Sequence, residues 1–125
     1  MEKQIDFYFD LVSPYSYIAS MLIDDVAHRG NAKVSWKPFL LGGVFKAVGT
    51  TEAPGLHPAK KPYLLKDLQR LSGHLKIPIK MPPDFPVRTV LAMRTLCGFN
   101  ADEIPQAAHT LYKAYWVNNQ DIADP

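Results

Sequence analysis

Hydrophobic residues near the start of the chain follow one period and then another. In the first stretch they occupy every second position, which is typical of a strand with one face in a core; these are Ile5, Phe7, Phe9 and Leu11. Beyond Ser13 they recur at helical spacing, with Met21 on the flank of the stripe; these are Ile18, Leu22 and Val26. The pattern predicts a strand, a junction at Ser13 and a helix.

The junction has the chemistry of a helix start. Serine is a favoured N-cap because its oxygen accepts a backbone N–H, and proline is favoured next because its φ is already helical. Ser13 and Pro14 are therefore predicted to be the N-cap and the first helical residue. A helix N-terminus also favours an anion, such as a thiolate. No histidine lies near this stretch in sequence, so we expect Ser13 either to hydrogen-bond a thiolate or only to cap the helix.

A second strand is predicted over residues 33–41, with Pro38 interrupting it towards its end. Before it, Gly30-Asn31 is predicted to end the helix, with the glycine in the left-handed conformation. A strand, a helix and a strand in this order form a βαβ unit with parallel strands. Residues 1–50, with a short helix at about 44–48, are assigned to this unit.

From about residue 60 onwards the pattern is helical. Three apolar stripes predict three helices; their members are Leu64, Leu68, Leu71 and Leu75, then Val90, Met93, Leu96 and Cys97, then Ile104, Ala107, Ala108, Leu111 and Tyr115. Residues 77–83 are rich in proline and are expected to run extended. Residues 51–125 are assigned to a second, helical part of the chain.

Three stretches carry a family resemblance. Ser13-Pro14-Tyr15-Ser16 looks like the Cys-Pro-Tyr-Cys motif of thioredoxin-like proteins with oxygen in place of sulfur. Together with its flanks (residues 7–17, FYFDLVSPYSY), residues 38–46 (PFLLGGVFK) and residues 66–70 (KDLQR, followed by Ile77-Pro78), it resembles the 2-hydroxychromene-2-carboxylate isomerases and the kappa-class glutathione transferases.

The resemblance implies an α/β fold in which a thioredoxin-like βαβ unit is followed by an all-helical insertion, as in DsbA-type oxidoreductases. Residues 1–50 would be the N-terminal half of the thioredoxin-like domain, and residues 51–125 the helical insertion domain. In the family a cis-proline, two strands and a last helix come later. We therefore expect the C-terminal ββα half of the thioredoxin fold to be absent from this chain. These 125 residues alone are not expected to form an active enzyme.

The composition of the chain limits the classes of binding partner. The chain is 47% hydrophobic, its formal net charge is +2, and it has no basic run, which argues against nucleic acid and a membrane surface as partners. We find no signal-peptide pattern and no apolar segment long enough to span a bilayer. The single Cys97 cannot form an internal disulfide, which favours a reducing, cytoplasmic location. Its side chain is predicted to be a small buried hydrophobe. The four histidines lack metal-ligand spacing, so no metal is expected.

The function implied by the resemblance is a glutathione-dependent isomerase in the degradation of naphthalene-type aromatic compounds. It would convert 2-hydroxychromene-2-carboxylate-type compounds to trans-o-hydroxybenzylidenepyruvate by reversible addition of the glutathione thiolate. Three alternatives stay open: a kappa-like glutathione transferase, a redox-dead thioredoxin-like binding module, and an inactive fragment. Family members are often dimers, so the resemblance also implies a homodimer.

Residue roles follow from the same resemblance. Ser13 is expected to hold the glutathione sulfur, and Pro14, Tyr15 and Thr50 to complete the cofactor site. Thr50 lies where the family carries an asparagine. The cations expected to meet the substrate carboxylate are Lys46, Lys61 and Arg88.

Three neighbouring features have plainer interpretations. Ser16 is expected to be structural, and one of Tyr15 and Tyr17 to line the substrate pocket. Asp67 and Arg70 are expected to form a local ion pair on one helix.

Overall fold

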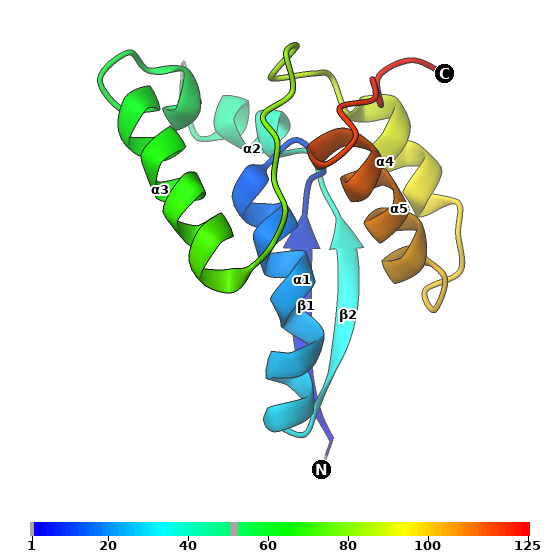
Figure 1. Ribbon diagram of the computed structural model, residues 1–125. Coiled ribbons are helices and arrows are strands. Elements are labelled where there is room, and N and C mark those ends of the chain that lie inside the picture. The colour runs from blue at the N-terminus through cyan, green and yellow to red at the C-terminus, as the bar shows by residue number, and fades with distance from the viewer. Residues whose placement is uncertain (1, 51–52) are drawn as a thin grey trace.

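A βαβ unit forms the centre of the molecule (Figure 1). The computed structural model describes residues 2–50 and 53–125. Strands β1 (Lys3–Phe9) and β2 (Ala32–Pro38) pair in parallel, and helix α1 (Pro14–Arg29) connects them. This confirms the predicted parallel unit. Both strands end earlier than predicted: β2 ends at Pro38, and the N–H of Phe39 adds one more hydrogen bond to the backbone oxygen of Phe9 at 3.1 Å.

The start of α1 is as predicted, whereas its end differs in detail. Ser13 is the N-cap, its Oγ accepts a hydrogen bond from the N–H of Ser16 at 3.1 Å, and Pro14 opens the first turn. At the other end Gly30 keeps a right-handed conformation, and Asn31 takes the left-handed one with φ 52°. Asparagine tolerates this region better than most residues, so it turns the chain into β2 in place of the glycine.

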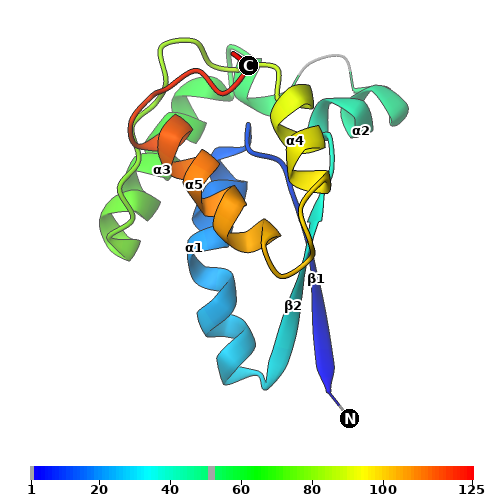
Figure 2. The same cartoon turned by 90° about the vertical axis from the view of Figure 1, so that its right-hand side faces the viewer.

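Helices are the remaining regular elements of the described chain. They are α2 (Leu41–Ala47), the 3-10 turn η1 (Pro54–Leu56), α3 (Lys61–Leu75), α4 (Val90–Cys97) and α5 (Ile104–Trp116). The three helices predicted beyond residue 60 are thus confirmed. Helix α1 contacts both α3 and α5, which lie on opposite sides of it in Figure 1. Figure 2 shows the same unit from the side of α4 and α5. None of the described helices combines the length and the hydropathy needed to cross a bilayer.

One hydrophobic core joins the βαβ unit to the helices. Phe9 at the end of β1 and Tyr112 of α5 are fully buried in it, with ring centroids 6.2 Å apart. Trp116 of α5 is also fully buried, and its Nε1 donates a hydrogen bond to the backbone oxygen of Leu11 at 2.8 Å. Helix α5 therefore supports the turn that leads into Ser13.

The extended segment between α3 and α4 lies against the chain after α5. The backbone N–H of Lys80 donates to the backbone oxygen of Trp116 at 2.8 Å. The Nδ2 of Asn119 donates to the oxygen of Lys80, also at 2.8 Å. Residues 77–82 have neither helix nor strand structure, as their prolines predicted.

Several predicted core positions are exposed. On α1 the buried face contains Tyr17, Ile18, Ser20 and Ala27. The predicted stripe was displaced by about one residue, so Val26 is 44% exposed and Met21 is 48% exposed. Cys97, predicted to be buried, is exposed, because it follows the fully buried Leu96 by one position and therefore lies about 100° further round the helix.

Candidate active site at the start of helix α1

A cavity of about 580 Å³ opens at the N-terminus of α1. Four segments line it: the turn at residues 10–15, the start of α2, the region from η1 to the first turn of α3, and residues 85–90. Most of the side chains that these segments contribute are apolar, including Leu41, Phe45, Leu56 and Phe85. A concave apolar space with a few polar groups is typical of a small-molecule site.

Ser13 lies at this cavity and is half-buried. Its Oγ accepts from the N–H of Ser16, and its own N–H donates to the backbone oxygen of Asp10 at 3.1 Å. Because the cap uses the oxygen as an acceptor, the hydroxyl hydrogen can still be donated to a ligand. No histidine is found among the described residues that line the cavity. The arrangement is suited to hydrogen-bonding an anion at the helix N-terminus.

Of the two tyrosines beside Ser13, Tyr15 lines the cavity. Its hydroxyl donates to Oδ2 of Asp67 on α3 at 2.5 Å. Burial, and then this hydrogen bond to a carboxylate, raise the pKa of Tyr15 to about 12. Tyr17 is buried instead, and its hydroxyl donates to the backbone oxygen of Pro78 at 2.6 Å.

The ion pair predicted between Asp67 and Arg70 is not formed. The Asp67 carboxylate binds the Tyr15 hydroxyl in its place. The bond from Tyr15 is a charge-assisted hydrogen bond, whereas an exposed ion pair on one helix contributes only a few tenths of a kcal/mol (about 0.3–0.5).

Ser16, at the position of the second cysteine of the thioredoxin-like motif, lies outside the cavity lining. Its Oγ lies 2.6 Å from the hydroxyl of Tyr112. Tyr112 is fully buried, and burial raises its pKa well above the usual range. Ser16 therefore links α1 to α5, which agrees with the structural role expected for it.

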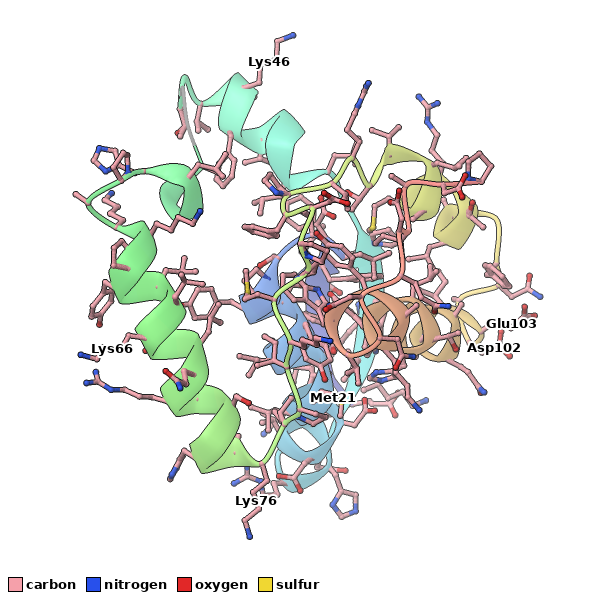
Figure 3. The ribbon with its side chains drawn as sticks, turned by 45° about the horizontal axis from the view of Figure 1, so that its top comes forward. Met21, Lys46, Lys66, Lys76, Asp102 and Glu103 are labelled. Carbon is pink, nitrogen blue, oxygen red and sulfur yellow. The ribbon has the colours of Figure 1, made fainter. Side chains whose placement is uncertain are left out.

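Among the predicted substrate cations, the structure brings only Arg88 to the cavity. Arg88 lies two residues before α4 and is the one cationic side chain among the lining residues that the structure describes. Lys61 is exposed at the first position of α3, and it is not part of the lining. Lys46 is exposed on α2 and extends away from the body of the molecule (Figure 3).

Thr50 is also outside the lining. It is exposed, and its N–H donates to the backbone oxygen of Phe45 at 2.8 Å, which closes the end of α2. Its neighbour Thr51 lies outside the described residues. Of the residues assigned to the cofactor, Ser13, Pro14 and Tyr15 are thus together at the cavity, and Thr50 is apart from them.

Sequence reasoning missed two buried polar residues of the cavity wall, Asp10 and Thr89. Thr89 Oγ1 donates to Oδ1 of Asp10 at 2.7 Å, although 79 positions separate them in sequence. In the alternating pattern of the strand, Asp10 has the position of a polar residue that faces solvent. The sequence around Thr89 contains no pattern that predicts its burial. Their pairing depends on tertiary structure alone. Among the described residues no group of three or more metal-ligating side chains is present.

Comparison with known proteins confirms the fold. The family model described as "DSBA-like thioredoxin domain" matches residues 4–125. This chain belongs to the DSBA-like thioredoxin domain family. A solved structure of 2-hydroxychromene-2-carboxylate isomerase has the same fold, with a TM-score of 0.80 over 95% of this chain and 59% of that chain, at 23% identity. The predicted thioredoxin-like βαβ unit followed by helices is therefore correct.

Curated relatives of this DSBA-like domain are named as kappa-class glutathione transferases or as 2-hydroxychromene-2-carboxylate isomerases, the two groups that the sequence resembles. Glutathione S-transferase kappa 1 of Homo sapiens is 30% identical over 133 residues, covering 100% of this chain and 58% of the relative. The 2-hydroxychromene-2-carboxylate isomerase of Sphingobium xenophagum is 30% identical over 86 residues, covering 68% of this chain and 44% of the relative. The chain thus spans about half the length of these relatives, which are transferases or isomerases by name.

Proposed function

We propose that this domain is the part of a glutathione-dependent isomerase that holds the glutathione thiolate and the carboxylate of an aromatic 2-oxo acid. The observation that carries the proposal is that Ser13, at the N-terminus of α1, and Arg88 line the same apolar cavity. The relatives named isomerases and transferases support glutathione as the cofactor.

Ser13 has the role of stabilising the thiolate. Its hydroxyl donates to the sulfur while its oxygen keeps the cap, and the N-terminus of α1 adds a partial positive charge. Lowering the pKa of the thiol by about 1–2 units requires about 1.4–2.7 kcal/mol of preferential interaction with the anion. One hydrogen bond to an anion together with the helix dipole is of this size.

The reaction needs no redox step. The hemiketal ring of a 2-hydroxychromene-2-carboxylate-type substrate opens first, which passes the hemiketal proton to the phenol oxygen and frees a 2-oxo group conjugated with the cis alkene. The glutathione thiolate then adds to this alkene, which turns the double bond into a single bond and moves charge onto an enolate. The new single bond rotates, and elimination of the thiolate restores the alkene in the trans form. Arg88 binds the carboxylate and stabilises the enolate, and the apolar wall holds the aromatic ring.

A kappa-like transferase is the second candidate, because relatives with that name match a larger share of this chain. It uses the same thiolate, but the electrophile keeps the sulfur and no elimination follows. Product analysis separates the two, because an isomerase regenerates free glutathione and a transferase consumes it stoichiometrically.

Because this chain alone is not expected to be an active enzyme, the test uses the domain within a protein that also has the C-terminal ββα half of the thioredoxin fold. The measurement is an absorbance assay of isomerisation with glutathione and with S-methylglutathione, which lacks the free thiol. We expect turnover only with glutathione, an increase in KM of about tenfold for Arg88→Ala, and no change for Arg94→Ala, whose side chain is exposed and outside the cavity. The proposal is contradicted by thiol-independent turnover. It is also contradicted if millimolar glutathione fails to raise the melting temperature, as a binding module would behave.

A further inference from the structure

The carboxylate of Asp10 joins three of the segments that form the cavity. It is buried, with 2% of its surface exposed, at the end of β1. Its Oδ1 accepts from the N–H of Val12 at 3.1 Å and from Oγ1 of Thr89 at 2.7 Å, and its Oδ2 accepts from the N–H of Leu41 at 2.9 Å. The turn before α1, the start of α2 and the segment before α4 therefore share one acceptor group.

Two residues with proposed chemical roles are adjacent to these contacts. Ser13 follows Val12, and its own N–H donates to the backbone oxygen of Asp10. Arg88 directly precedes Thr89. Residues 85–89 have no helix or strand structure of their own, so the hydroxyl of Thr89 ties an irregular segment to the βαβ unit. Phe85 and Val87 pack against the core, and the bond from Thr89 fixes the backbone directly after Arg88.

We propose that Asp10, acting through Thr89, is a positioning residue that holds Arg88 at a fixed distance from Ser13 and so selects aromatic ligands that carry a carboxylate. This inference rests on the proposed function, because it takes Arg88 as the carboxylate ligand. A guanidinium recognises a carboxylate best in a bidentate, planar geometry. Small displacements of a positioning group have large effects on binding and rate, so a tether on the preceding residue determines selectivity.

The test compares Thr89→Val, which keeps the shape of the side chain and removes the hydroxyl, with Thr89→Ser, which keeps the hydroxyl. The probes are 2-naphthoate and the uncharged 2-naphthamide, with affinities measured by calorimetry on the full chain. We expect Thr89→Val to weaken naphthoate binding about tenfold and to change naphthamide binding by no more than about twofold. Thr89→Ser should restore the preference for the carboxylate.

A second arm removes Arg88. In an Arg88→Ala background, Thr89→Val should have no further effect on naphthoate, because the coupling that the tether provides is already lost. Asp10→Asn offers one acceptor oxygen in place of two and should reproduce the loss of selectivity. Equal weakening of both probes by Thr89→Val would mean a merely structural role and would overturn the inference.

Wild-type protein that does not prefer naphthoate to naphthamide would overturn the inference as well, together with the role of Arg88. Failure of the proposed function has a different signature. A protein that prefers naphthoate through Thr89 and Arg88, but has no glutathione-dependent turnover, keeps the positioning role and loses the isomerase assignment. Calorimetry reports the first property and the absorbance assay reports the second.

Discussion

Trp116 donates an indole hydrogen bond to the backbone oxygen of Leu11 at 2.8 Å, across 105 positions of sequence. Leu11 lies in the turn between β1 and α1, two residues before Ser13, and both Trp116 and Leu11 are fully buried. Helix α5 thus contacts the turn that positions Ser13, the residue proposed to hydrogen-bond the thiolate. The helices beyond residue 60 are a structural part of the site, not only a cover for it.

Removing this indole donor should destabilise the domain. In Trp116→Phe the buried oxygen of Leu11 loses its partner, which costs about 1–3 kcal/mol, in addition to the loss of packing volume. Tyr63→Phe is the control, because the Tyr63 side chain is 68% exposed and its hydroxyl faces solvent. Urea denaturation followed by circular dichroism should show the larger loss for Trp116→Phe. Equal losses would contradict the importance of the indole bond.

Ser16 and Tyr112 should be energetically coupled. Ser16→Ala leaves the buried hydroxyl of Tyr112 without its partner and should cost about 1–3 kcal/mol of unfolding free energy. Adding Tyr112→Phe removes the unsatisfied group, so the double variant should be more stable than the sum of the two single losses predicts. A double-mutant cycle from urea midpoints measures this coupling. Strict additivity would show that the two hydroxyls do not interact.

The hydrogen bond between Tyr15 and Asp67 gives a prediction on pH. The pKa of Tyr15, about 12 in the folded protein, lies above its ordinary value of 10.0. A raised pKa contributes stability that is fully present below pH 10 and is lost as the pH rises towards 12. In a spectrophotometric tyrosinate titration, Asp67→Asn should lower the pKa of one tyrosine, and Tyr15→Phe should remove that transition. If Asp67→Asn leaves every tyrosine transition in place, the contact does not control Tyr15.

Local patterns along the chain were sufficient to predict the elements around the site. Ser13 and Pro14 predicted the start of α1 because an N-cap depends only on neighbouring residues. Helix α5 was predicted from its apolar stripe because burial on one face produces a 3.6-residue period. These features depend on nearest neighbours or on a single helix face.

The contacts that assemble the site could not be predicted in this way. Asp67 binds Tyr15, 52 positions away, and not Arg70 on its own helix, because the fold brings a stronger partner to it. The hydrogen bond of Asp10 with Thr89 depends equally on tertiary structure. Cys97 was assigned to the core from its stripe, although its position one residue beyond Leu96 turns it towards solvent. Long-range pairing and the rotation of a helix about its axis leave only weak traces in sequence.

The most direct test of the account is the pKa of the glutathione thiol in the presence of the protein, followed at the thiolate absorption band. We expect bound glutathione to titrate about 1–2 units below the ordinary thiol value of about 8.5. Ser13→Ala should abolish this shift. Ser13→Asp should abolish it too while keeping the fold, because aspartate caps α1 through the N–H of Ser16 but has no hydrogen to donate to sulfur. An unshifted thiol in the wild type, or a shift that survives both substitutions, would contradict the central role of Ser13.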